Sequence, residues 1–170
     1  QKIIDDLGEC LPPEELLLYP ANESIVAEFA ISSPELSGQR IEALSRLAEG
    51  FRGVLVVPFA GIRRIIVPKE SFRNAVVKVS AGDVILKDEF VSRLTGLGYE
   101  RVEQVERRGE MSVRGGIVDV YPLVPLPGAG DGDRAVRLEW FDDEIDTIRL
   151  FDVADQRSRE KPDTVTLLPC

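Results

Sequence analysis

Two hydrophobic patterns follow one another along the chain and predict two structural classes. Before Pro68, continuous apolar runs at residues 16–19 and 54–57 are typical of buried strands. Between these runs, a helix is expected to begin at Ser33 and Pro34 and to end at Gly50, with apolar residues at helical spacing: Ile41, Leu44, Leu47 and Ala48. The order strand, helix, strand predicts βαβ connectivity. Residues 1–73 are therefore expected to be a truncated parallel α/β piece of a larger domain.

A different pattern follows and predicts an α+β domain at residues 74–155. A strand is expected at residues 75–79 and an amphipathic helix at 87–97, ended by Gly98. From Tyr99 onward the pattern is typical of antiparallel strands, at residues 112–121, 135–141 and 145–151. Residues 156–170 include a last strand, at 164–168, which we expect to return to the α/β piece. The expected core of the central domain contains Val79, Phe90, Leu94, Val136, Leu138 and Trp140.

One predicted strand carries the most informative polar pattern. In residues 135–141, alternation places Val136, Leu138 and Trp140 on one face, and Arg137, Glu139 and Phe141 on the other. An exposed aromatic residue beside an arginine is typical of a protein-binding hot spot. The alternative, that another element covers Phe141, is equally compatible with the pattern. Arg114 precedes Gly115-Gly116, where a β-bulge could redirect its side chain.

Composition and charge exclude several function classes. The 170 residues contain no histidine and two distant cysteines, Cys10 and Cys170, so histidine-based catalysis and zinc knuckles are excluded. No GxxxxGK[ST] phosphate-binding loop occurs. The net charge of −9 opposes charge-driven DNA binding, so we expect weak or no DNA binding. No apolar run approaches the roughly 20 residues that a membrane span needs, and no secretory signal is recognisable, so we expect a cytoplasmic protein without membrane contact.

Other charged groups are better explained as surface structure. The acidic residues Asp142, Asp143, Glu144 and Asp146 lack a calcium-loop spacing and indicate a solvated turn rather than a metal site. Two further pairs, Glu106 with Glu110 and Arg107 with Arg108, are expected at a turn rather than in an acid–base pair or a phosphate clamp. The sequon at Asn22-Glu23-Ser24 has no meaning in a cytoplasmic chain.

Three stretches resemble a known interaction domain. They are GYERVEQVE at residues 98–106, GEMSVRGGIVDVYP at 109–122 and RLEWFDDEID at 137–146. These stretches are similar to the UvrB-type UvrA-interaction domain, which occurs in the excision-repair protein UvrB and in transcription-repair coupling factors (Mfd). The segments YERVEQV (99–105) and FDVADQRS (151–158), with the helix that follows Ser33, resemble the Mfd family.

The resemblance implies a fold, a function and a site. The α/β piece would be a degenerate P-loop-type remnant, joined to a mainly antiparallel interaction domain. The chain would recruit UvrA through Arg114, Arg137 and Phe141, and would have no catalytic residue, metal site or cofactor of its own. From its place on the same strand face, Glu139 is expected to orient either arginine by an ion pair. RNA polymerase, DNA, ATP and Mg would belong to translocase modules absent from this fragment. The alternative is a fragment of a UvrB-type, ATP-dependent helicase-like repair protein that contacts DNA and nucleotide directly.

Overall fold

The computed structural model describes residues 2–21, 33–62, 66–126 and 134–170, and the chain divides into two compact units, Gln1–Asn74 and Ala75–Cys170. This division falls one residue from the expected boundary at 73/74. Among the helices of the described residues, none is both long and apolar enough to cross a membrane.

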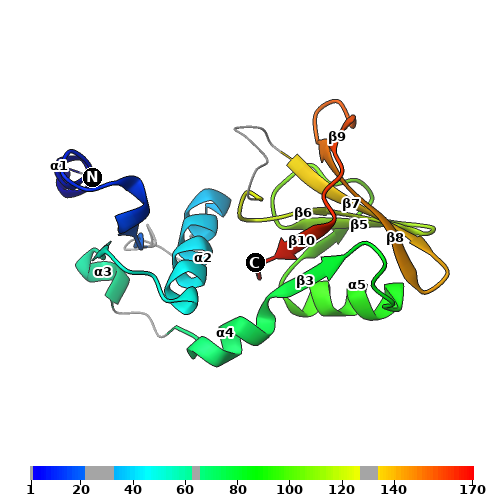
Figure 1. Ribbon diagram of the computed structural model, residues 1–170, viewed down its shortest axis with the longest axis horizontal. Helices are drawn as coiled ribbons and strands as arrows, with labels where there is room; N and C mark the ends of the chain where they lie inside the picture. The colour runs from blue at the N-terminus through cyan, green and yellow to red at the C-terminus, as the bar shows by residue number, and fades with distance from the viewer. Residues whose placement is uncertain (1, 22–32, 63–65, 127–133) are drawn as a thin grey trace, which may run out of the picture. The chain divides into compact units, whose positions relative to one another are not determined.

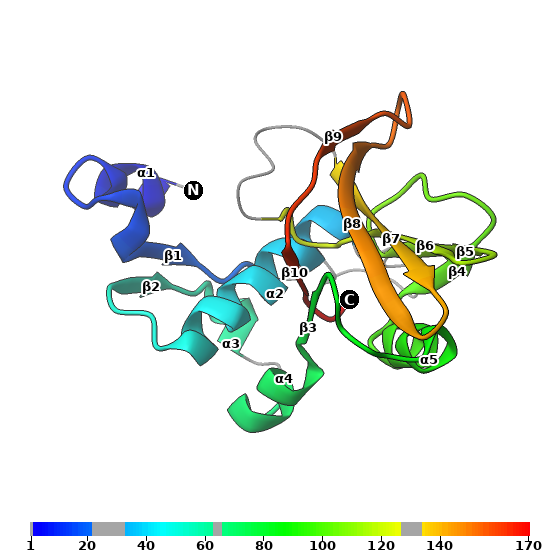
Figure 2. The same cartoon turned by 45° about the vertical axis from the view of Figure 1, so that its right-hand side comes forward.

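The first unit contains a parallel strand pair, labelled in Figure 2, joined through a helix that Figure 1 labels α2. Strands β1 (Leu16–Leu18) and β2 (Val54–Val56) pair in parallel, with α2 (Pro34–Glu49) between them in the sequence. The predicted βαβ connectivity is thus confirmed. Gly50 ends α2 in the left-handed conformation, with φ of 95°, as the sequence predicts for a helix C-terminus. The remaining helices are α1 (Lys2–Gly8), η1 (Pro13–Glu15), α3 (Phe59–Ile62) and α4 (Lys69–Ala75), which reaches the unit boundary.

Strand β2 differs from its expected burial. Its apolar sequence is typical of a strand covered on both faces, yet Val54 and Leu55 are exposed. Only one strand pairs with β2 in the described residues, so its other edge is unpaired and the sheet of this unit is too small to be covered on both faces. The sequon at 22–24 lies outside the described residues.

The second unit is built around a six-stranded sheet of order β4-β5-β6-β7-β8-β9 (Figures 1 and 2). Its strands are β4 (Glu100–Val102), β5 (Glu110–Arg114), β6 (Ile117–Tyr121), β7 (Arg134–Phe141), β8 (Glu144–Asp152) and β9 (Ser158–Glu160). The strands from β5 to β9 pair antiparallel, in agreement with the antiparallel pattern expected from Tyr99 onward, although β9 was not predicted as a strand, whereas β4 pairs parallel to β5. The α+β class of this unit is therefore confirmed.

The last strand corrects the expected domain organisation. Strand β10 (Thr164–Leu167) pairs antiparallel with β3 (Val77–Ser80), and residues 156–170 belong to the second unit. The predicted return of this segment to the α/β piece is therefore wrong. The physical reason is that β3 has its own open edge, and the buried Val165 and Leu167 pack there against the same core as Val77.

The core of the second unit forms between α5 (Lys87–Gly96) and one face of the sheet, against which α5 lies in both views (Figures 1 and 2). Phe90 and Leu94 of α5 are buried among strand residues. All six core residues predicted from the sequence contribute: Val79, Phe90, Leu94, Val136 and Leu138 are buried, and Trp140 packs against them, partly buried. The Trp140 indole also donates a hydrogen bond to the Ile85 carbonyl at 2.9 Å.

The two glycines after Arg114 form a tight hairpin rather than a bulge. Arg114 pairs with Ile117 across an unbroken β5–β6 register, so Gly115 and Gly116 are the two turn residues. Gly115 has φ of 58°, which a residue with a side chain seldom adopts. The strand expected at 112–121 is therefore two strands, and Arg114 lies at the end of the first.

Candidate protein-interaction surface

The strand registers assign every central residue of the sheet to one of two faces. On β7, Val136 and Leu138 are buried toward α5, while Arg137, Glu139 and Phe141 lie on the opposite face. The alternation predicted from the sequence is thus confirmed. Asp119 of β6 lies directly opposite Arg137, and Ser112 of β5 lies directly opposite Asp119, so these residues share the second face.

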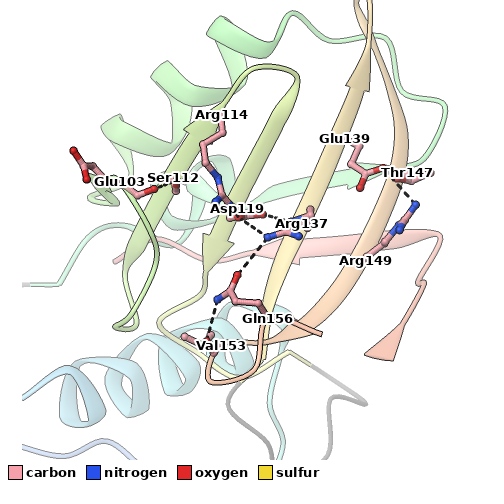
Figure 3. Close-up of polar contacts among 10 residues, drawn as sticks. All are labelled: Glu103, Ser112, Arg114, Asp119, Arg137, Glu139, Thr147, Arg149, Val153 and Gln156. Carbon is pink, nitrogen blue, oxygen red and sulfur yellow. Dashed lines mark hydrogen bonds and ion pairs between the residues drawn. The ribbon is translucent and has the colours of Figure 1, made fainter. Parts of the chain in front are cut away.

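Asp119 connects the two predicted arginines (Figure 3). Its carboxylate is almost completely buried and accepts hydrogen bonds from Arg114 Nη2 at 2.5 Å, Arg137 Nε at 2.7 Å and Arg137 Nη2 at 2.9 Å. Two positive charges therefore meet one negative charge, and the cluster keeps a net positive charge at the surface. The arginine side chains differ in exposure, 49% for Arg114 and 20% for Arg137.

Arg137 is held on three sides. Besides Asp119, its guanidinium carbon lies 4.7 Å from the centre of the Phe151 ring, and its Nη2 lies 3.5 Å from Gln156 Oε1. Gln156, with φ of 58°, donates in turn to the Val153 carbonyl at 2.9 Å. The hydrogen bonds to the Asp119 carboxylate raise the pKa of Arg137 above its ordinary value, against the opposing effect of burial. Arg137 is thus a fixed, charged group.

Glu139 has a different role from the one expected. Instead of pairing with Arg114 or Arg137, its carboxylate accepts a hydrogen bond from the Thr147 hydroxyl at 2.8 Å and lies 3.4 Å from Arg149 Nη2 (Figure 3). The prediction that Glu139 orients an arginine by an ion pair is therefore wrong. Asp119 does so because it lies opposite Arg137 on the neighbouring strand, whereas Thr147 of β8 lies opposite Glu139.

Phe141 is exposed at the end of β7. Its exposed fraction is 78%, so within the described residues no element covers it, and the covered alternative is wrong. Asp142, with φ of 57°, begins the tight turn into β8 that the sequence predicts. The face thus combines a rigid arginine pair with an exposed aromatic ring, the composition of a protein-binding hot spot.

The other charged candidates have structural roles. Glu110 is buried, and its Oε2 accepts hydrogen bonds from the backbone N–H groups of Glu106 and Arg107, which fixes the turn before β5. Arg108 lies over the Tyr121 ring, with its guanidinium carbon 5.1 Å from the ring centre. In the described part of the chain, no group of three or more metal-ligating side chains is arranged to hold an ion.

Asp119 is the residue of this candidate surface that sequence reasoning missed. A signal was present, since Asp119 is the single charged residue in the strand sequence IVDVY. A charge inside an apolar strand needs a buried partner, because an unpaired buried carboxylate is costly. The partners could not be identified from the pattern alone, because the β5–β6–β7 register brings them together from 5 and 18 residues away.

Comparison with known proteins shows a family match and similarity to longer relatives. Residues 77–170 match the UvrB interaction domain. The chain is 41% identical over 169 residues to the transcription-repair-coupling factor of Bacillus subtilis (strain 168) and 37% identical over 166 residues to that of Staphylococcus aureus (strain USA300). These alignments cover 99% and 98% of this chain but 14% of each relative, so the chain spans about one seventh of their length. The predicted resemblance to transcription-repair coupling factors is thereby confirmed, and because the matched domain occupies more than half of the sequence, the chain belongs to the UvrB interaction domain family.

Proposed function

We propose that this chain is a non-catalytic UvrA-binding module of a transcription-repair coupling factor, and that it recruits UvrA to stalled transcription complexes. The observation that carries the proposal is the surface formed by Arg114, Arg137 and Phe141 within the region that matches the UvrB interaction domain. The similarity along nearly the whole chain to transcription-repair-coupling factors supports the cellular role.

The geometry suggests different tasks for the two arginines. Arg137 directs its Nε–Nη2 edge to Asp119, so this edge is already engaged in a bidentate contact inside the chain. Arg114 makes a single contact with Asp119 through Nη2, and its side chain is half exposed. Its remaining N–H groups are therefore suited to donate hydrogen bonds to a carboxylate of the partner. Phe141 supplies an apolar contact on the same face, two residues along β7 from Glu139, which lies in the same row of the sheet as Arg114.

The remaining parts of the proposal concern the longer protein. RNA polymerase, DNA, ATP and Mg would be bound by translocase modules outside this chain, and the first unit would be a degenerate P-loop-type remnant. The proposed setting is the cytoplasm. The parallel β1–β2 pair joined through α2 supports the remnant, because this is the connectivity of P-loop-type domains.

Calorimetry with purified UvrA tests the function. The 170-residue chain is expected to bind UvrA at near-physiological salt, and Arg114→Ala is expected to weaken binding by about 1–3 kcal/mol without loss of folding. A matched control is Arg101→Ala, an exposed arginine on β4 at the edge of the sheet. Equal binding by the parent, Arg114→Ala and Arg101→Ala would contradict the assigned surface. ATP turnover or tight DNA binding by the chain would favour the UvrB-type helicase alternative.

A further inference from the structure

A second exposed apolar area lies beside Phe141, on the segment between β3 and α5. Among the large hydrophobic residues that the structure describes in the second unit, three are exposed: Phe141, Val84 and Leu86, with exposed fractions of 78%, 75% and 55%. Isolated surface hydrophobic residues are common, but a contiguous group indicates an interaction site. The strand registers decide whether these three residues form such a group.

Backbone pairing places Val84 and Phe141 on either side of one residue. Val84 forms an antiparallel bridge with Glu144, and Glu144 is directly opposite Phe141 in the β7–β8 ladder. Directly opposite residues point to the same face, with Cα atoms about 4.5–5.5 Å apart. Val84, Glu144 and Phe141 therefore form one row across the sheet, and Leu86 follows two residues after Val84.

The segment that carries Val84 and Leu86 is firmly attached to the sheet. The Ile85 N–H donates to the Asp143 carbonyl at 2.8 Å, and the Ile145 N–H donates to the Asp83 carbonyl at 3.0 Å. The Trp140 indole donates to the Ile85 carbonyl, and the Ile85 side chain packs against the core. The two residues that flank Ile85 are thus held outward at fixed positions. Such preorganisation lowers the entropy cost of binding.

Charges around the row define the chemistry of the partner surface. Exposed carboxylates surround Phe141 at the hairpin end: Asp142, Asp143, Glu144 and Asp146. The half-exposed Arg114 lies at the end of the adjacent β5–β6 hairpin. A complementary surface has an apolar centre, basic groups that face the hairpin carboxylates and a carboxylate that faces Arg114.

We infer that Val84 and Leu86 extend the UvrA-binding surface beyond Phe141, so that UvrA covers Arg114, the row of Phe141, Glu144 and Val84, and the segment before α5. This inference rests on the proposed function, because it assigns both areas to one partner. The shared face, the fixed backbone and the continuity with Phe141 support a single contact area.

Calorimetry of UvrA binding with V84S/L86S tests the inference, with Val67→Ser as a matched control because Val67 is an exposed apolar residue of the first unit. The double variant is expected to raise the Kd about tenfold, while the unfolding midpoint followed by Trp140 fluorescence does not fall, because Leu86 is the N-cap of α5 and serine is favoured there. Val67→Ser is expected to bind like the parent.

The outcomes separate the two proposals. If the parent binds UvrA and Phe141→Ala weakens binding but V84S/L86S does not, the extension is wrong and the proposed function stands. An equal loss of UvrA affinity in Val67→Ser also overturns the extension, because the effect of the substitutions is then not specific to the surface around Phe141. If the parent fails to bind UvrA, the proposed function is wrong, and the extension falls with it.

Discussion

Replacing Asp119 with asparagine is expected to destabilise the second unit more than removing either arginine that contacts it. The exposed fraction of Asp119 is 1%, and its carboxylate accepts three hydrogen bonds from guanidinium N–H groups. An asparagine amide has the same shape but one acceptor oxygen, and its NH₂ group would face donors. Arg114 and Arg137 would then repel each other without a compensating charge.

The structure sets the expected magnitudes. Breaking a fully buried ion pair costs about 3–5 kcal/mol, and the partial exposure of both arginines lowers this to about 2–4 kcal/mol for Asp119→Asn. Arg137→Ala is expected to cost about 1–3 kcal/mol, because Asp119 keeps only one partner. Arg114→Ala is expected to cost at most about 1 kcal/mol, since its side chain is half exposed.

Urea unfolding followed by tryptophan fluorescence measures these differences. Trp140 is the single tryptophan of the chain and contacts Phe90 with ring centres 5.2 Å apart, so its emission reports the core of the second unit. Asp146→Asn, an exposed carboxylate on β8, is the matched control and is expected to stay within about 0.5 kcal/mol of the parent. If Asp119→Asn is as stable as this control, the Asp119 cluster does not hold the strands together.

Four further results are expected. Leu138→Ala should lower the free energy of unfolding by about 2–5 kcal/mol, because Leu138 is fully buried and leaves a cavity; urea unfolding measures this. Phe141→Ala should leave the unfolding free energy within about 0.5 kcal/mol but weaken UvrA binding by about 1–3 kcal/mol in calorimetry. Gly116→Ala should cost about 1–2 kcal/mol in urea unfolding, because its Cβ would lie 3.0 Å from the Trp140 carbonyl oxygen. A phosphate-release assay should detect no ATP hydrolysis, since the sequence has no phosphate-binding loop.

The periodicity of the sequence predicts the features that depend only on local backbone geometry, namely strand faces and helices. The alternation along residues 135–141 placed Arg137 and Phe141 on one face, because successive side chains of a strand point to opposite faces whatever the tertiary context. The helices that follow Ser33 and Leu86 were predicted for a similar reason, since helical spacing and a terminal glycine are local signals.

Pairing between distant segments could not be predicted in the same way. The direction of β4 depends on how residues 103–109 return to the start of β5, and this path has no period in the sequence. The pairing of β10 with β3 depends on which strand edge is open in the folded chain. The Gly115-Gly116 pair fits both a bulge and a two-residue turn, and the register with Ile117 decides between them.

Recognition explains the charged cluster on this face better than stability does. Apolar residues of similar volume in place of a buried charged group often give an equally stable or more stable protein, so a stability role alone does not account for Asp119 between two arginines. The cluster does fix the Arg114 and Arg137 side chains. Each would otherwise pay up to about 2 kcal/mol in lost side-chain conformational entropy when a partner binds. Arg137 is also held by Phe151 and Gln156, which leaves little freedom to lose when a partner binds. A fixed positive site on the same face as the exposed Phe141 is therefore what the buried carboxylate provides, and this is the property that a protein-binding surface needs.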